Sequence, residues 1–99
     1  MSYQLVVTQE ALNDFLEISA YIAADSPQRA RTFIAELRVG MENSLRSFTN
    51  AGRRYGDLRL YTAGNYVAAY RVDESTKTVT VILVTEGHRD WQEPLEDRL

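Results

Sequence analysis

The chain has 99 residues, a net charge of −3, one histidine and no cysteine. This length fits a single small domain over residues 1–99, and the lack of cysteine excludes both a disulfide framework and a thiolate metal site. The acidic balance argues against general coating of nucleic acid, although the arginines still allow one local anion-binding patch. We find no secretion signal and no apolar span of membrane length, so we expect a cytoplasmic protein with no membrane partner.

The chain opens with a predicted strand and helix. Residues Tyr3–Thr8 alternate well enough for a short strand. Residues Gln9–Ala24 predict a helix with Thr8 as its N-cap and an apolar stripe at Ala11, Phe15, Ile18 and Ile22. The polar residues of this helix are expected to face away from the core, namely Asn13, Asp14 and Glu17.

A second helix follows the break at Asp25-Ser26-Pro27 and is predicted to end near Phe48. Its apolar face is formed by Ala30, Ile34, Leu37, Met41, Leu45 and Phe48. Gly40 lies inside this helix, and we interpret it as a point of close contact with a neighbouring element. The short link makes the two helices an antiparallel hairpin, which needs a sheet to cover its apolar faces.

The second half of the chain predicts a loop and then a strand hairpin. Thr49–Asp57 contains two glycines and an asparagine, which indicates a loop. Leu58–Tyr61 and Tyr66–Val72 are expected to form strands joined by a turn at residues 62–65. Asp73–Lys77 is a second turn, which leads into the last strand.

The last strand begins near Val79 and is apolar on both faces, which predicts a central strand covered from both sides. Alternation assigns Val79, Val81 and Leu83 to one face, and Ile82 and Val84 to the other. A polar tail is expected from about residue 92. The predicted order is β-α-α-β-β-β, an α+β fold with a helical hairpin packed on a small, mostly antiparallel sheet.

Several short motifs together resemble one protein family. They are Ile18–Pro27 with Ala30, Phe33 and Leu37, then Gly52-Arg53, Leu58-Arg59, Tyr66-Val67, Ala69–Asp73 and Val81–Trp91. Their order and spacing resemble the RelE/ParE superfamily of bacterial toxin–antitoxin systems, and ParE-like toxins in particular, over nearly the whole chain. The resemblance implies a compact toxin held inactive by a cognate antitoxin in a hetero-oligomer. ParE-like members poison DNA gyrase, whereas RelE-like members cut messenger RNA on the ribosome.

The end of the last strand departs from both patterns. Glu86 stands where ParE-like chains often have a histidine, and His88 replaces the first basic residue. Trp91 replaces the tyrosine usual in RelE-like chains, and the sequence pI of about 5.1 is low for a ribosome-directed protein. The target, gyrase or ribosome, therefore remains open at this stage.

If the chain is RelE-like, the candidate catalytic residues are His88, Arg89, Arg59 and Arg71. Metal-free ribonuclease chemistry needs an acid and a base, which histidine supplies near pH 7, and cations around the phosphate, which arginines supply. The alternative is a solvent-facing histidine with arginines paired to Glu86, Asp57 or Asp90. The single lysine, Lys77, counts against a ribosome-binding nuclease, since ribosomal RNA is a dense phosphate surface.

The candidate target-binding residues are Arg53, Arg54 and Trp91. The two arginines lie in the predicted loop, where they either contact the target or only solvate the loop. Trp91, with Tyr61 or Tyr66, either stacks on a base or covers the edge of the core. One histidine and no cysteine predict no metal site, and no motif indicates a cofactor.

Three functions follow from the sequence. The preferred one is a gyrase inhibitor without catalytic residues, and the second is a ribosome-dependent endoribonuclease. The third is an inactive homologue that only binds its antitoxin. Exposed positions of the helical hairpin and any open sheet edge are candidate antitoxin contacts.

Overall fold

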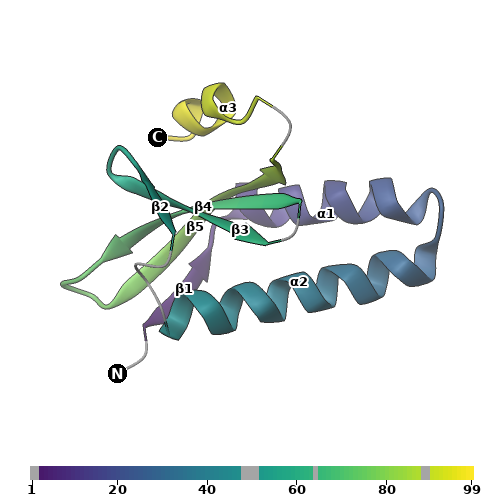
Figure 1. The fold of residues 1–99 in the computed structure, drawn as a ribbon, viewed down its shortest axis with the longest axis horizontal. Helices are drawn as coiled ribbons and strands as arrows, with labels where there is room; N and C mark the ends of the chain where they lie inside the picture. Colours follow the sequence, from purple (N-terminus) through teal and green to yellow (C-terminus); the bar gives the residue numbers. More distant parts are fainter. Residues whose placement is uncertain (1–2, 48–51, 64, 88–89) are drawn as a thin grey trace.

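The computed structural model describes residues 3–47, 52–63, 65–87 and 90–99 (Figure 1). Its elements, in chain order, are β1 (Gln4–Val7), α1 (Gln9–Ala23), α2 (Pro27–Ser47), β2 (Arg53–Tyr55), β3 (Leu58–Ala63), β4 (Tyr66–Asp73), β5 (Thr78–Glu86) and α3 (Gln92–Asp97). The five strands form one sheet in the order β1-β5-β4-β3-β2. β1 is parallel to β5 and the other neighbours are antiparallel. The predicted α+β fold with a mostly antiparallel sheet is confirmed.

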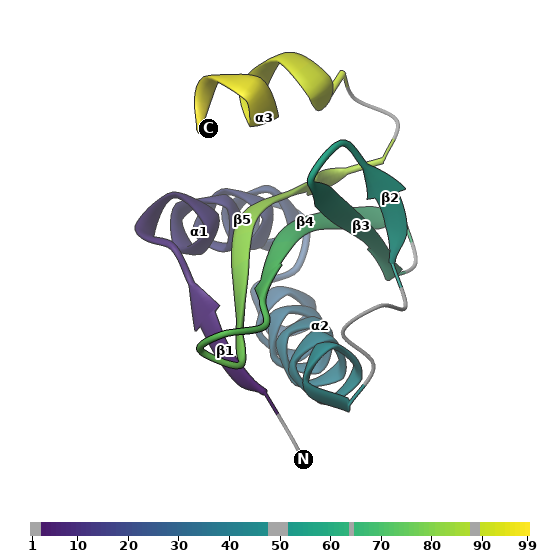
Figure 2. The same cartoon turned by 90° about the vertical axis from the view of Figure 1, so that its left-hand side faces the viewer.

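Helices cover both faces of the sheet (Figure 2). The α1–α2 hairpin packs on one face around a cluster that we call the hairpin-side core, formed by Ala11, Phe15, Met41, Ala68, Tyr70, Val79, Val81 and Val84. α3 packs on the other face over the α3-side core, formed by Leu58, Leu60, Ala69, Ile82, Leu83, Trp91 and Leu95. The predicted last strand is β5, which lies between β1 and β4 and is buried from both sides, as expected.

The predicted helical hairpin is confirmed, and side chains next to the start of each helix cap it. The Thr8 hydroxyl accepts a hydrogen bond from the Ala11 N–H, and α2 begins at Pro27 with Ser26 accepting from the Arg29 N–H. Such caps satisfy backbone donors that the first helical turn leaves without partners. The interpretation of Gly40 was wrong, because a Cβ added there would meet nothing within 4 Å. The predicted helix end at Phe48 lies outside the described residues.

Part of the predicted loop at residues 49–57 is a strand. β2 pairs with the start of β3 through a turn at Gly56 and Asp57, and Gly56 has a positive φ of 59°. Two of the three residues of β2 are arginines. The loop prediction was therefore wrong here because so short and polar a strand carries no periodic signal and forms through pairing with its neighbour.

The predicted polar tail is a helix. α3 contains one large apolar residue, Leu95, which is fully buried against the sheet. Trp91 immediately precedes the helix and packs edge-on against Tyr55 of β2, with ring centroids 5.1 Å apart. Trp91 and Leu95 together are enough to hold this short segment against the core, although its composition is polar.

A β-bulge shifts the two faces of β5. Ala69 pairs with Leu83 but the next residue, Tyr70, pairs with Val81, so Ile82 has no partner on β4. Beyond the bulge the alternation is out of phase with Val79 and Val81. The face prediction was therefore wrong for the end of β5: Leu83 lies in the α3-side core and Val84 in the hairpin-side core.

Candidate functional site

A groove of about 460 Å³ lies between α1, α3 and the end of β5. Its lining residues come from α1, β4, β5, α3 and the residues that flank α3: Asp14, Glu17, Ile18, Tyr21, Tyr66, Leu83, Val84, Thr85, Glu86, Asp90, Trp91, Pro94 and Arg98. The groove thus joins the α1 side of the helical hairpin to the C-terminal helix across the end of β5.

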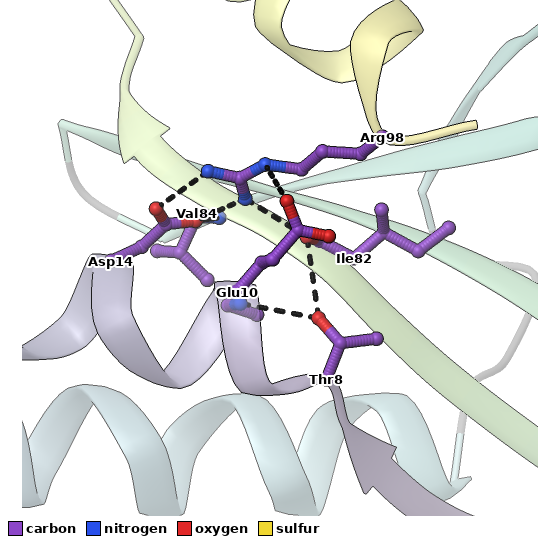
Figure 3. A network of polar contacts seen from close by, with 7 residues as sticks. Thr8, Glu10, Asp14, Ile82, Val84 and Arg98 are labelled. Carbon is purple, nitrogen blue, oxygen red and sulfur yellow. Dashed lines mark hydrogen bonds and ion pairs between the residues drawn. The ribbon is translucent and has the colours of Figure 1, made fainter.

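Side chains replace a missing strand at the base of this groove (Figure 3). β1 ends at Val7, so the edge of β5 beyond Val81 has no strand beside it. There the Ile82 carbonyl accepts from Arg98 Nη1 at 3.0 Å and from the Thr8 hydroxyl at 3.5 Å. The Val84 N–H donates to Asp14 Oδ2 at 2.9 Å. These contacts satisfy backbone groups whose burial without a partner would cost free energy.

Arg98 and Asp14 hold α3 against α1. Arg98 Nη1 donates to Asp14 Oδ2 at 2.6 Å and Nη2 donates to Oδ1 at 2.9 Å, a bidentate pair. Their side chains are only 18% and 12% exposed, and Glu10 Oε2 lies 3.6 Å from Arg98 Nε. The hydrogen bonds to Asp14 raise the pKa of Arg98. The expectation that Asp14 faces away was wrong, and no sequence signal links residues 84 positions apart.

Gly52 is held by two side chains of the sheet. Its N–H donates to the Tyr70 hydroxyl at 2.9 Å, and its carbonyl accepts from Arg59 Nη1 at 3.0 Å. A Cβ at this position would lie 2.6 Å from the Leu60 carbonyl oxygen and 2.7 Å from the Tyr70 hydroxyl. Burial raises the pKa of Tyr70, while the Gly52 hydrogen bond and the Arg59 charge act in the opposite direction. Glycine is therefore required here by close approach, just before Arg53.

The predicted arginines do not share one face of the sheet. Arg59 pairs with Tyr70, whose side chain lies in the hairpin-side core, so Arg59 projects to that face. Arg71 is the next residue along β4 and projects to the opposite face, where it is exposed. By the same argument Arg54 shares the face of Arg59, whereas Arg53 shares the face of Leu60.

The other predicted site residues divide into two groups. His88 and Arg89 lie outside the described residues, so the catalytic assignment stays a prediction. Trp91 is 9% exposed and belongs to the α3-side core, which fits the interpretation of a side chain that covers the edge of the core. Tyr66 contacts Phe33 of α2 instead of Trp91, with ring centroids 5.2 Å apart.

Two features are absent from residues 3–47, 52–63, 65–87 and 90–99. No group of three or more histidine or carboxylate side chains within them is arranged to hold a metal ion. Likewise, no helix in the described part of the chain has the length and apolarity needed to cross a membrane.

Solved structures with similar folds include toxin–antitoxin systems and an isolated toxin. The chain matches the chromosomal ParDE system of P. aeruginosa with a TM-score of 0.71 at 20% identity, covering 85% of this chain and 95% of that one. It matches the RelBE2 toxin–antitoxin complex of Mycobacterium tuberculosis with a TM-score of 0.63 at 21% identity, covering 87% and 99%. The isolated E. coli RelE toxin gives a TM-score of 0.61 at 20% identity, covering 98% and 99%.

A protein-family model also matches the amino-acid sequence of the chain. No curated protein matches the chain. The model of the family described as the ParE toxin of the type II toxin–antitoxin system parDE matches residues 5–91, which include both helices of the hairpin and all five strands except the first residue of β1. The chain therefore belongs to the family of ParE toxins of type II toxin–antitoxin systems.

Proposed function

We propose that this protein is a ParE-like toxin that inhibits DNA gyrase and is neutralised by a cognate antitoxin. The family match over residues 5–91 supports a ParE-like activity. The antitoxin is supported by the RelBE2 neighbour, which was solved as a toxin–antitoxin complex. The net charge of −3 also favours a protein target over the phosphate surface of a ribosome.

The observation that carries the choice between targets is the placement of the arginines. A ribonuclease would need several cations to converge on one phosphate. Here Arg59 donates to the Gly52 carbonyl on the hairpin side of the sheet, while Arg71 projects from the opposite face. A gyrase inhibitor needs no such convergence, and the exposed Arg53 and Arg54 on the terminal strand β2 suit contact with a protein surface.

A supercoiling assay with purified gyrase tests this proposal. The intact protein is expected to inhibit supercoiling at micromolar concentration, and His88→Ala is expected to keep that activity. Arg53→Ala/Arg54→Ala should weaken inhibition by about 30-fold, the effect of losing two charged contacts at about 1 kcal/mol each. Arg29→Ala/Arg31→Ala, which removes two exposed charges from α2, is the matched control and should change nothing.

The same preparations distinguish the two alternatives. Cleavage of messenger RNA in a translating extract, lost in His88→Ala or Arg89→Ala, would replace the gyrase proposal with a RelE-like endoribonuclease. If the intact protein inhibits neither gyrase nor translation but binds its antitoxin tightly, it is an inactive homologue that serves as a binding module.

A further inference from the structure

The groove between α1 and α3 has an apolar floor and an aromatic wall. Leu83 and Val84 are nearly fully buried beneath it. Tyr21 of α1 is 75% exposed at its rim, an unusual position for a large aromatic side chain, and the half-buried Tyr66 lies beside the floor. A groove with these walls can take the long aliphatic part of a partner side chain.

Carboxylates outnumber cations among the described residues that line the groove. Four carboxylates line it, from Asp14, Glu17, Glu86 and Asp90. Arg98 is the one cation among its described lining residues, and Asp14, Glu10 and the Ile82 carbonyl already occupy its guanidinium. Within the described chain, Glu17, Glu86 and Asp90 have no ion pair. The described lining therefore carries a net negative charge above an apolar floor.

We propose that this groove binds a basic segment of the cognate antitoxin, through a lysine or arginine side chain. The alkyl part of that side chain would lie along Tyr21 and Tyr66, where the aromatic faces also attract its charge. Its cationic head would reach Glu17 and Glu86. The same carboxylates repel phosphate, so the occupant is a protein segment and not RNA. The inference rests on the proposed toxin function, because it names the chemistry of the toxin's partner.

Peptide selection with Trp91 as a reporter tests this inference. Random 12-residue peptides displayed on phage are selected on the immobilised full-length protein and then measured by the fluorescence of Trp91, the only tryptophan of the chain, which lines the groove. The peptides that perturb Trp91 are expected to carry at least two lysines or arginines. Their affinity should fall at least tenfold in Glu17→Gln/Glu86→Gln, and should also fall when salt is raised from about 50 to 500 mM.

The matched control is Glu36→Gln/Glu96→Gln, which makes the same change of charge at two exposed positions outside the groove. It should keep the affinity of the wild-type protein. Selection of peptides without basic residues, or equal loss of affinity in both double variants, would overturn the inference. Circular dichroism and thermal melting check that both variants fold.

The test separates failure of this inference from failure of the proposed function. Glu17→Gln/Glu86→Gln is expected to inhibit gyrase as well as the wild-type protein does, because neither residue is among the proposed target contacts. If the wild-type protein does not inhibit gyrase, the target is wrong, whereas peptide binding still reports on the groove. If it inhibits gyrase but its groove selects no basic peptide, the inference alone fails.

Discussion

The Arg98 guanidinium and the Asp14 carboxylate meet through two hydrogen bonds of 2.6 and 2.9 Å, and each side chain also bonds to the backbone of β5. This pair joins α3, α1 and the open edge of β5 at one point. Removing Asp14 leaves the Arg98 charge partly buried and the Val84 N–H without its acceptor. Removing Arg98 leaves the Asp14 charge partly buried and the Ile82 carbonyl with only the 3.5 Å bond from Thr8. α3 has few other anchors, because Leu95 is its one fully buried residue.

Arg98→Ala is therefore expected to lower the free energy of unfolding by about 2–4 kcal/mol. Asp14→Asn should cost a similar amount, because the amide cannot accept two charge-assisted bonds. A double-mutant cycle from urea unfolding is the measurement, and the double variant should be much less destabilised than the sum of the singles. Arg38→Ala, which breaks an exposed pair with Glu42, is the control and should cost less than about 0.5 kcal/mol. Additive effects at Arg98 and Asp14 would contradict the coupling.

Two glycine-to-alanine substitutions should act in opposite directions. Gly52→Ala places a Cβ 2.6 Å from the Leu60 carbonyl oxygen, so the backbone must shift and both hydrogen bonds of Gly52 weaken. We expect a loss of about 2–4 kcal/mol of unfolding free energy. Gly40→Ala meets no atom within 4 Å inside α2 and should stabilise the protein by about 0.5–1 kcal/mol. Thermal melting measures the stability of both variants. A Gly52→Ala variant as stable as the wild-type protein would contradict the close approach of Gly52 to the Leu60 carbonyl.

Alkaline pH should destabilise the protein through Tyr70. Burial raises its pKa above the ordinary value of 10.0, so folding favours the neutral hydroxyl. Below about pH 10 this contribution is fully present, and it is lost as the pH rises towards the folded-state pKa, since the unfolded chain ionises first. Unfolding free energy measured in urea from pH 8 to 11 should therefore decline.

The variant Tyr70→Phe isolates this effect. It should be less stable than the wild-type protein at pH 8 by about 1 kcal/mol, because the Gly52 N–H loses its acceptor. Its stability should decline less steeply above pH 10. Tyr21→Phe, at a tyrosine that is 75% exposed, is the matched control and should keep the slope of the wild-type protein. Equal slopes in all three proteins would count against a role for Tyr70.

Expression in bacteria without an antitoxin should stop DNA synthesis first. Pulse labelling with thymidine and methionine follows DNA and protein synthesis separately after induction. A gyrase inhibitor lowers thymidine incorporation before methionine incorporation, with filamentous cells. Collapse of methionine incorporation within minutes would instead indicate a ribosomal nuclease, and His88→Ala would then be the first variant to examine.

The elements that sequence reasoning placed correctly are those whose signals are local. Thr8 and Ser26 cap helices within three residues of themselves, and the apolar stripe at Ala11 and Phe15 repeats at helical spacing. β4 and β5 are long and apolar enough to be recognised as strands from the sequence. Each of these features depends on neighbours in the chain, so one sequence contains the information.

The features that sequence reasoning missed depend on contacts between residues that lie far apart in the chain. Arg98 bonds to Asp14, which lies 84 positions away in the sequence. α3 is held in place because Leu95 is buried against the strands of the sheet. β2 exists because β3 pairs with it. Arg59 and Arg71 looked like one cluster in sequence, yet the strand register projects them from opposite faces.

The bulge at Ile82 sets which face of the sheet the end of β5 presents to the groove. Ile82 is the extra residue, and Glu86 pairs with Tyr66, whose ring faces α2, and so reaches the groove. Deleting Ile82 would restore simple alternation while Leu83–Glu86 keep their partners on β4, so Glu86 would stay on its present face. The deletion would also remove the carbonyl that Arg98 and Thr8 bind. The inserted residue therefore acts through its backbone carbonyl, which ties α1 and the C-terminal end of α3 to the edge of β5.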